Sequence, residues 1–182
     1  MRSSTLRMDS GIDSPKVDTR KTRWKNIARI MRAKGGILLQ ILCILKNCNA
    51  YQKIKLYGGG NYFGLPPTRG IICWDKYQMM PTFSRWEYAW TSFDCPARLF
   101  GYRPQDSARF HPTQKPIALY KWILQNYAKP GDIILDTHVG SASSLIACEE
   151  LGFDYVGFEI DPEYYQKATQ RINEFNQQVR MF

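Results

Sequence analysis

The sequence predicts an α/β fold, and two features of its C-terminal part carry that prediction. From residue 131 onward, short apolar runs alternate with longer stretches in which apolar residues recur every three or four positions. The short runs are typical of buried strands and the longer stretches of amphipathic helices. Glycine, proline and aspartate stand at the joints between them. The predicted order is strand, helix, strand, helix.

The first strand and helix have clear boundaries. A Pro-Gly-Asp turn at residues 130–132 precedes an apolar run at 133–135, which ends on Asp136. After a loop rich in small residues, Ser143 is expected to cap a helix that runs to about residue 150, and Gly152 ends it. This places a small-residue loop directly after a buried strand.

The second strand and helix follow at once. Residues 155–158 are expected to form a strand that ends on Glu159, and Asp161 with Pro162 has the form of an N-cap followed by the first helical residue. A further helix is expected to begin at Pro116 and to pack on the same sheet. The apolar faces of the two helices comprise Tyr165, Ala168, Ile172 and Phe175 in the later one and Ile117, Tyr120, Ile123, Leu124 and Tyr127 in the earlier one.

The charge of the chain is unevenly distributed. The net charge is +9, but residues 1–57 hold 13 Lys and Arg against 3 Asp and no Glu, a net charge of +10, whereas residues 58–182 carry −1. A basic protein invites a nucleic-acid interpretation, but here all of the basicity lies in the first third. A basic arm without any glutamate is unusual.

Cysteine usage and hydropathy favour a soluble protein of a reducing compartment. The five cysteines include no CxxC pair, so neither a disulfide framework nor a metal site is indicated, and we expect a cytoplasmic location. The longest apolar stretch lies around residues 37–45 and is interrupted by Gln40, well short of the ~18 residues of a membrane helix. A secretory signal is the alternative for the same stretch and is not favoured, because the stretch lies too far into the chain and no small-residue cleavage site follows it.

The loop after the first strand is a candidate nucleoside site. In open α/β sheets, ligands lie beyond the carboxyl ends of the strands, where small residues let backbone amides approach. Residues 136–142 form such a loop, and Glu159, 19 positions after Gly140, could accept hydrogen bonds from ribose hydroxyls. A tight turn without a ligand is the alternative.

Three strings give this site a family resemblance. His-Pro-Thr-Gln-Lys-Pro at 111–116, Leu-Asp-Thr-His-Val-Gly-Ser-Ala-Ser at 135–143 and Gly-Phe-Glu-Ile-Asp-Pro-Glu-Tyr-Tyr at 157–165 resemble, in this order, motifs of DNA amino-methyltransferases of the permuted type. The resemblance implies a Rossmann-like, mostly parallel doubly wound sheet, here incomplete on its N-terminal side. It also implies S-adenosyl-L-methionine as cofactor and a flipped adenine or cytosine of double-stranded DNA as substrate.

The resemblance also assigns cofactor-binding residues. It implies that Thr113 and Lys115 line the methionine end of the cofactor and that Glu159 binds the ribose. The full expected set is Thr113, Lys115, Asp136, His138, Gly140, Ser141, Ala142, Ser143, Glu159 and Asp161. Family members usually show Pro-Phe at 137–138 and Gly at 142, where this chain has Thr-His and Ala. His111 either belongs to the pocket or only fixes a turn.

The segment from residue 57 to 102 holds twelve aromatic residues among 46 and resembles phage and prophage adenine methylases. Aromatic faces stack on a flipped base, so the resemblance implies a substrate-binding region; core packing is the alternative for each ring. Five arginines in this region and just after it are candidates for phosphate contacts. The expected substrate-binding residues are Asn61, Phe63, Trp74, Trp90 and Phe93, and the arginines are Arg69, Arg85, Arg98, Arg103 and Arg109.

The catalytic tetrapeptide of the family, Asp/Asn/Ser-Pro-Pro-Tyr/Phe, is absent from the sequence. Our hypothesis is that residues 1–57 are read out of frame. Permitted codons for residues 52–58, shifted back by one base, encode Lys-Asn-Gln-Ile-Ile-Trp-Gly, the lead-in that such methylases have. We therefore divide the chain into a basic, non-native or disordered segment 1–57 and a methyltransferase domain 58–182, with 58–110 facing DNA and 111–182 binding cofactor.

The resulting prediction is a restriction-modification type DNA methyltransferase, bacterial or phage-encoded, with little activity as this chain alone. Its target atom is adenine N6 or cytosine N4, and the aromatic region favours adenine. No catalytic residue, metal or membrane contact is assigned to it. Two alternatives stay open: a DNA-binding or regulatory module without catalysis, and a nucleotide-dependent oxidoreductase built on the same strand–helix unit.

Overall fold

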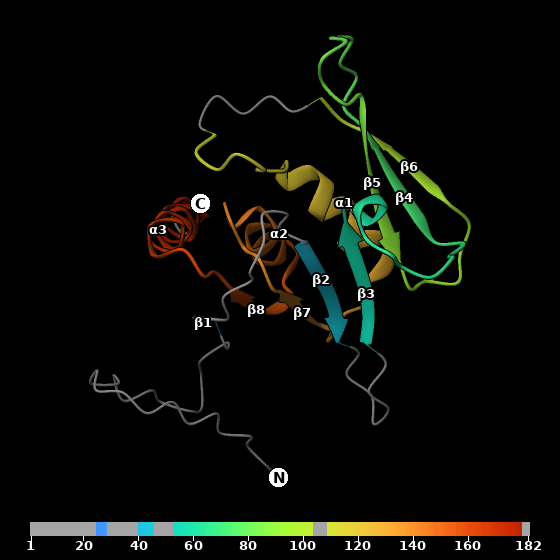
Figure 1. Ribbon diagram of the computed structural model, residues 1–182. Coiled ribbons are helices and arrows are strands. Elements are labelled where there is room, and N and C mark those ends of the chain that lie inside the picture. The colour runs from blue at the N-terminus through green and yellow to red at the C-terminus, as the bar shows by residue number, and fades with distance from the viewer. Residues whose placement is uncertain (1–24, 29–39, 46–52, 104–108, 180–182) are drawn as a thin grey trace.

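A computed structural model describes residues 25–28, 40–45, 53–103 and 109–179, which form one eight-stranded sheet flanked by helices (Figure 1). The strand order across the sheet is β1-β8-β7-β2-β3-β5-β4-β6. The strands are β1 (Lys25–Ala28), β2 (Gln40–Leu45), β3 (Lys53–Gly58), β4 (Ile71–Asp75), β5 (Trp86–Thr91), β6 (Arg98–Gly101), β7 (Ile133–Asp136) and β8 (Asp154–Phe158). The helices are α1 (Ile117–Tyr127), α2 (Ser143–Leu151) and α3 (Pro162–Val179), with a 3-10 turn η1 (Gly60–Tyr62) after β3.

The predicted strand–helix unit is confirmed as β7-α2-β8-α3. Gly152 ends α2 with a φ of 76°, and Pro162 begins α3 as expected. The Asp161 carboxylate accepts hydrogen bonds from the backbone N–H groups of Glu163 at 2.8 Å and Tyr164 at 3.1 Å, which is the geometry of an N-cap. The start of α2 differs, because Ser143 is its first residue and not its cap.

The sheet is of the predicted α/β class but is mixed rather than mostly parallel. The pairs β1–β8, β7–β8 and β4–β6 are parallel, whereas the four other pairs within the described residues are antiparallel. Only residues 46–52 separate β2 from β3, which is too short a connection for a parallel crossover. The parallel pairs are therefore confined to the β1-β8-β7 side of the sheet and to the β4–β6 pair at its far edge.

The core lies between the sheet and the helices α1 and α2. Leu124 and Leu145 of these helices and Ile134 of β7 are at most 1% exposed, and Tyr155 of β8 packs with them. Burial of such side chains contributes about 1.5–3 kcal/mol each, so this layer holds the end of β7 and the start of α2 in place. In Figure 1, α1 and α2 lie over the middle of the sheet, and α3 lies outside α2.

Strands β2 and β3 belong wholly or mostly to segment 1–57, which the sequence analysis expects to be non-native or disordered. Most of segment 1–57 lies outside the described residues, so the prediction of loose packing is open there. Within it, however, Leu42 and Ile44 of β2 are 2% and 3% exposed and belong to the core. For this strand loose packing is contradicted, because β2 pairs with β7 on one side and β3 on the other.

The described residues contain neither a membrane-spanning helix nor a cluster of metal-ligand side chains. None of the described helices has both the length and the apolar character to cross a bilayer. The described residues also contain no group of three or more His, Cys, Asp and Glu side chains placed to hold a metal ion.

Candidate functional site

Asp136 organises the loop between β7 and α2. Its side chain is fully buried, and its two carboxylate oxygens accept hydrogen bonds from different ends of the loop: the backbone N–H of His138 at 2.9 Å and the hydroxyl of Ser144. Hydrogen bonds to a carboxylate are stronger than those between neutral groups, so a buried carboxylate that accepts several of them holds the donors firmly in place. The end of the strand and the first turn of α2 are therefore fixed to one another.

Glu159, at the carboxyl end of β8, lies against the same loop. One carboxylate oxygen accepts the backbone N–H of Gly140 at 2.7 Å, and the other accepts that of Asp161 at 3.0 Å. The residue is 9% exposed. Gly140 and Glu159, which are 19 positions apart, thus lie together at the site where the sequence analysis expected both of them. An ionised carboxylate has further lone pairs, so Glu159 keeps the capacity to accept from hydroxyl groups.

His111 covers the loop from the side of the 111–116 segment. The imidazole of His111 fills the space beside Gly140, because a Cβ built on Gly140 would come within 3.2 Å of the ring. The imidazole also packs edge to face on the ring of Tyr164, with 4.4 Å between the ring centroids. Its Nδ1 also accepts the backbone N–H of Thr113 at 3.3 Å, and the Thr113 hydroxyl lies 3.1 Å from it. His111 therefore both fixes the turn at residues 111–113 and lines the β7–α2 loop.

The charge state of His111 follows from its burial. Burial lowers the pKa of its imidazole, and Arg109 and Lys115 lower it further, against the opposing effect of Glu159 and Asp161. The ring is thus neutral at physiological pH and accepts through Nδ1.

Ala142 has a strained backbone. Its φ is +62°, in the left-handed region, and the residue is fully buried. The family resemblance marks this position, because family members usually have glycine there. A methyl group in this conformation costs about 1–2 kcal/mol, which glycine avoids.

Replacing Ala142 by Gly is expected to raise the free energy of unfolding by about 0.5–1 kcal/mol, after the entropic cost of glycine is subtracted. Ala147 is the matched control, since it is equally buried but lies in the middle of α2, the helix that Ala142 precedes. There the same change should lower the free energy by about 1 kcal/mol. Urea unfolding of both variants measures the two effects, and an A142G variant destabilised as much as A147G would contradict the strain.

Arg171 of α3 is a part of the site that sequence reasoning missed. Its guanidinium donates to the carbonyl oxygen of Ser141 at 2.7 Å and to the hydroxyl of Ser143 at 3.1 Å. The hydroxyls of these two serines lie 3.1 Å apart. The available signal was its spacing, because Arg171 is three positions after Ala168 and four before Phe175 of the predicted apolar face.

The remaining expected cofactor residues are placed differently. The ring of His138 contacts the hydroxyl of Thr137 at 2.9 Å, within the loop itself. Lys115 points away from the loop toward β5, where its ammonium lies 3.0 Å from the carboxylate of Glu87. Thr113 contacts His111 rather than the loop. The loop, Glu159 and His111 are therefore assembled, whereas Lys115 faces the aromatic region.

The five expected substrate-binding residues are not assembled into one stacking surface. Trp74 pairs across the sheet with Glu87, and Trp90 pairs with Ile71, so the two indoles project from opposite faces. The Trp74 indole N–H donates to the carbonyl oxygen of Tyr102 at 2.8 Å, and that of Trp90 to the carbonyl oxygen of Pro66 at 2.7 Å. Phe93 packs on Tyr127 at 4.4 Å, while Asn61 and Phe63 lie in and after η1.

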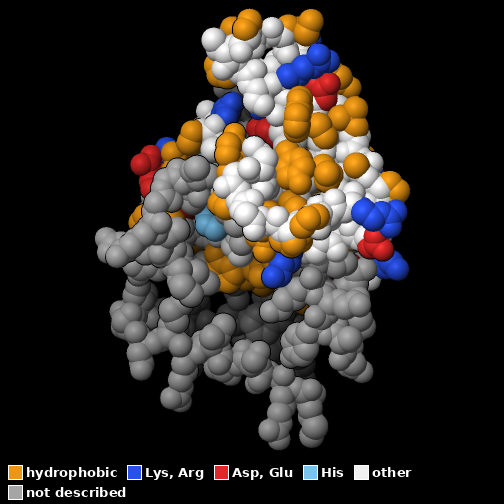
Figure 2. Space-filling view, turned by 45° about the vertical axis from the view of Figure 1, so that its right-hand side comes forward, with side chains coloured by type: hydrophobic (Ala, Val, Ile, Leu, Met, Phe, Trp, Pro, Cys, Tyr) orange, Lys and Arg blue, Asp and Glu red, His pale blue; other side chains and the backbone are white. Residues whose placement is uncertain are grey.

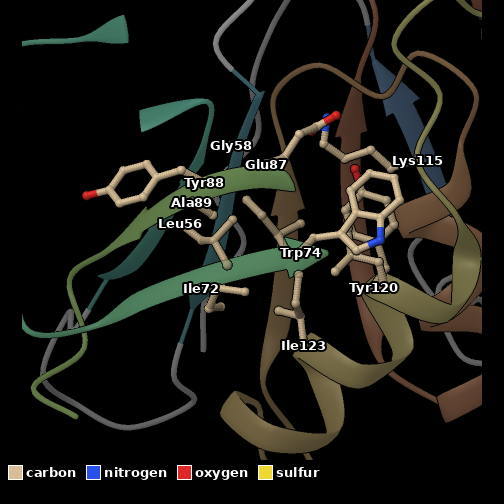
Figure 3. A pocket seen from close by; sticks show the side chains of 12 residues that line it. Leu56, Gly58, Ile72, Trp74, Glu87, Tyr88, Ala89, Lys115, Tyr120 and Ile123 are labelled. Atoms are coloured by element: carbon tan, nitrogen blue, oxygen red, sulfur yellow. The ribbon is translucent and has the colours of Figure 1, made fainter. Parts of the chain in front are cut away.

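A hollow lies between α1 and the strands β3, β4 and β5 (Figure 3). It has a volume of about 440 Å³, including the part that is open to solvent. Apolar side chains such as Ile72, Trp74 and Ile123 line it, and Glu87 and Lys115 are the charged groups beside them. The hollow thus lies where the aromatic region meets the 111–116 segment.

Residues 74–170 match the family model described as DNA methylase, of the N6/N4 type. The match spans more than half of the chain. The chain belongs to the DNA methylase family. The family predicted from the three motifs is confirmed, and the matched range of the DNA methylase includes the 111–116 segment, the β7–α2 loop and Glu159.

Curated relatives of this DNA methylase are bacterial. Type II methyltransferase M.HpaI of Haemophilus parainfluenzae is 42% identical over 67 residues, which are 36% of this chain and 21% of the relative. Putative methylase YubD of Escherichia coli (strain K12) is 33% identical over 64 residues, 35% of this chain and 28% of the relative. The matched part thus spans 21% to 28% of the length of these relatives.

Solved structures that resemble the DNA methylase include the M1.HpyAVI–SAM complex, at 29% identity over 57% of this chain and 61% of that chain, with a TM-score of 0.49. PvuII DNA methyltransferase (cytosine-N4-specific) shows 13% identity, coverage of 61% and 56%, and a TM-score of 0.45.

Proposed function

We propose that this chain binds S-adenosyl-L-methionine in the β7–α2 loop and forms the cofactor half of a DNA amino-methyltransferase. The observation that carries this is the joint placement of Asp136, Gly140 and Glu159 at the carboxyl ends of two parallel strands. This is where open α/β sheets bind nucleosides. When bound, the cofactor supplies a methyl group on a positively charged sulfur.

The residues present fit such a ligand. Glu159 is the acceptor for the ribose hydroxyls, and the backbone N–H of Gly140 holds its carboxylate at 2.7 Å. Asp136 and Arg171 hold that loop from beneath and from α3. His111 and Tyr164 border it on the remaining side. Preorganised donors and acceptors of this kind bind without reorganisation, which favours affinity.

Double-stranded DNA is the proposed substrate, with adenine N6 as the proposed target atom. Large apolar side chains are exposed on the turn between β4 and β5, and Figure 2 shows apolar side chains gathered over this part of the molecule. Exposed patches of this kind mark interaction sites. The exposed side chains are those of Tyr77, Met79, Met80 and Phe83 in the turn and of Trp86 at the start of β5, and they range from 51% to 85% exposed.

We further propose that this chain alone transfers methyl groups slowly or not at all. The sequence lacks the tetrapeptide whose polar side chain and carbonyl would accept from the target amino group, and whose ring would stack on the base. Transfer of a tritiated methyl group to DNA measures this. The expected rate is at least about a hundredfold below that of an intact relative, since a positioned acceptor contributes 10²–10⁴-fold. Turnover at the relative's rate would contradict it.

A further inference from the structure

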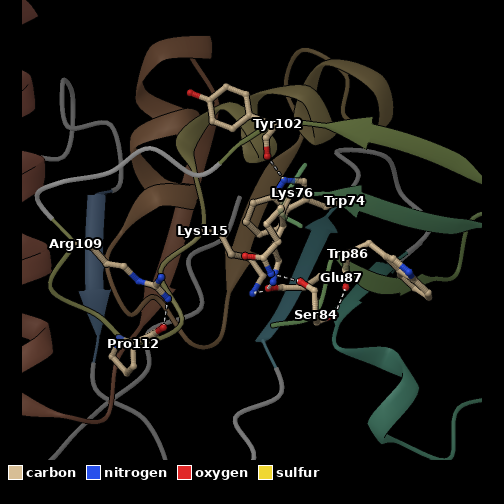
Figure 4. A network of polar contacts seen from close by, with 10 residues as sticks. Trp74, Lys76, Ser84, Trp86, Glu87, Tyr102, Arg109, Pro112 and Lys115 are labelled. Atoms are coloured by element: carbon tan, nitrogen blue, oxygen red, sulfur yellow. Dashed lines mark hydrogen bonds and ion pairs between the residues drawn. The ribbon is translucent and has the colours of Figure 1, made fainter. Parts of the chain in front are cut away.

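Glu87 of β5 lies between two lysines that come from different parts of the chain (Figure 4). Its carboxylate is 2.9 Å from the ammonium of Lys76, just after β4, and 3.0 Å from that of Lys115. The three side chains are 34%, 15% and 18% exposed, respectively. Partly buried pairs are screened less by salt than surface pairs, so this cluster is a firm contact between the aromatic region and the 111–116 segment.

The segment that carries Lys115 is a compact turn, so a restraint at one end reaches the other. The backbone N–H of Gln114 donates to the carbonyl oxygen of His111 at 3.1 Å, and the Gln114 side chain accepts the N–H of Phe110 at 3.4 Å. Gln114 is only 8% exposed. Lys115 therefore does not move independently of His111, four residues before it.

His111 is the point where this turn meets the cofactor loop. Its ring occupies the space beside Gly140 and packs on Tyr164. Contacts thus run without a gap from Glu87 through Lys115 and the turn to the loop that is proposed to bind S-adenosyl-L-methionine.

We propose that Glu87 is a positioning residue for the cofactor site: by holding Lys115 it sets the 110–115 turn and places His111 against Gly140. This inference rests on the proposed function and assigns Lys115 to the support of the pocket rather than to contact with the cofactor. The aromatic region, through Glu87, then influences how tightly the cofactor half binds its ligand.

The test compares three variants around one carboxylate. Glu87→Gln removes the charge at constant size, Lys115→Met removes the lysine of the turn, and Lys76→Met is the matched control that removes the other lysine. Calorimetric titration with S-adenosyl-L-methionine is expected to show about five- to tenfold weaker binding for E87Q and K115M, at the lower end of site-to-site coupling, and less than twofold change for K76M.

The direct-contact alternative gives the opposite pattern. If Lys115 bound the cofactor itself, E87Q would release it and binding would be unchanged or tighter, while K115M alone would lose affinity; that result overturns the inference. Equal losses for K76M and E87Q would also overturn it, because the cluster would then act on stability alone. Thermal unfolding of each variant, without ligand, verifies that it is folded.

A second readout does not depend on cofactor binding. His111 is one of two histidines in the chain, so its imidazole resonances are readily assigned. E87Q and K115M are expected to shift the NMR titration midpoint of His111, whereas K76M leaves it in place. Failure of the wild-type chain to bind S-adenosyl-L-methionine would overturn the proposed function, and an unmoved His111 titration in E87Q would overturn the positioning role.

The same cluster gives the folded state a pH dependence. Burial opposes ionisation of Glu87, but Lys115 and Lys76 outweigh it, so the pKa of Glu87 lies below the ordinary glutamate value of 4.5. The unfolded chain therefore takes up this proton at a higher pH than the folded chain. The contribution of Glu87 to stability is fully present above pH 4.5 and is lost as the pH falls through the lowered pKa.

Urea unfolding of wild type and E87Q between pH 3 and 7 measures that contribution as the difference between the two proteins. The difference is expected to be constant at neutral pH and to shrink in the acid range. A difference that grew as the pH fell would contradict the ion pairs.

Discussion

Replacing Glu159 by Ala is expected to weaken the binding of S-adenosyl-L-methionine at least about thirtyfold. The change removes the acceptor for the ribose hydroxyls and also frees the backbone N–H groups of Gly140 and Asp161. Hydrogen bonds to charged groups contribute about 1.5–3 kcal/mol, and about 2 kcal/mol corresponds to this factor. Glu159→Gln keeps one acceptor oxygen and the side-chain size, so its loss is expected to be smaller.

Glu163→Ala is the matched control for this prediction. Glu163 is also an acidic residue at the start of α3, but its side chain is 73% exposed and pairs only with Lys167 among the contacts described. Its removal should leave affinity unchanged within twofold. Calorimetric titration measures all three variants. An E159A variant that binds within threefold of wild type would show that the ligand does not contact the end of β8.

Replacing Asp136 by Ala is expected to lower the free energy of unfolding by about 2–5 kcal/mol. The carboxylate is fully buried, and its loss leaves the N–H of His138 and the hydroxyl of Ser144 without these acceptors. Each buried polar group without a partner costs about 1–3 kcal/mol. The same change is expected to abolish cofactor binding, because the loop between β7 and α2 loses its tie.

Asp136→Asn separates charge from hydrogen bonding in that result. Its carbonyl oxygen still accepts from His138, and its amide group can donate to the Ser144 hydroxyl, so the expected loss is nearer 1 kcal/mol. Urea unfolding followed by circular dichroism gives both values. Equal losses for D136A and D136N would mean that charge, and not hydrogen-bond satisfaction, holds the loop.

The element boundaries and the core of the β7–α2 site could be predicted because local sequence signals determine them. The Pro-Gly-Asp turn, Gly152 and the Asp161–Pro162 pair each fix an element boundary through their own chemistry, and the structure has those boundaries. The approach of Glu159 to Gly140 was also predictable, because both follow the carboxyl ends of neighbouring parallel strands. Ala142 stood out in the sequence as an alanine in place of glycine, and its positive φ gives the physical reason.

Long-range packing explains what could not be predicted. Glu87 and Lys115 are 28 positions apart, and neither carries a local sign of its partner. The direction of β2 depends on its pairing with β7, more than 80 residues later, and not on its own sequence. Likewise, the aromatic residues indicate a stacking region, but their sequence does not show from which face of the sheet each ring projects. The sequence therefore did not reveal that Trp74 and Trp90 lie on opposite faces.

The measurement that tests the central claim most directly is a calorimetric titration of the chain with S-adenosyl-L-methionine and, in parallel, with NAD. Saturable binding of the former at one site per chain, lost in E159A and retained in E163A, with no heat from NAD, is the expected result. The assignment of the β7–α2 loop as a methyl-donor site would be contradicted if the chain bound only NAD. It would also be contradicted if the chain, shown to be folded, bound neither ligand.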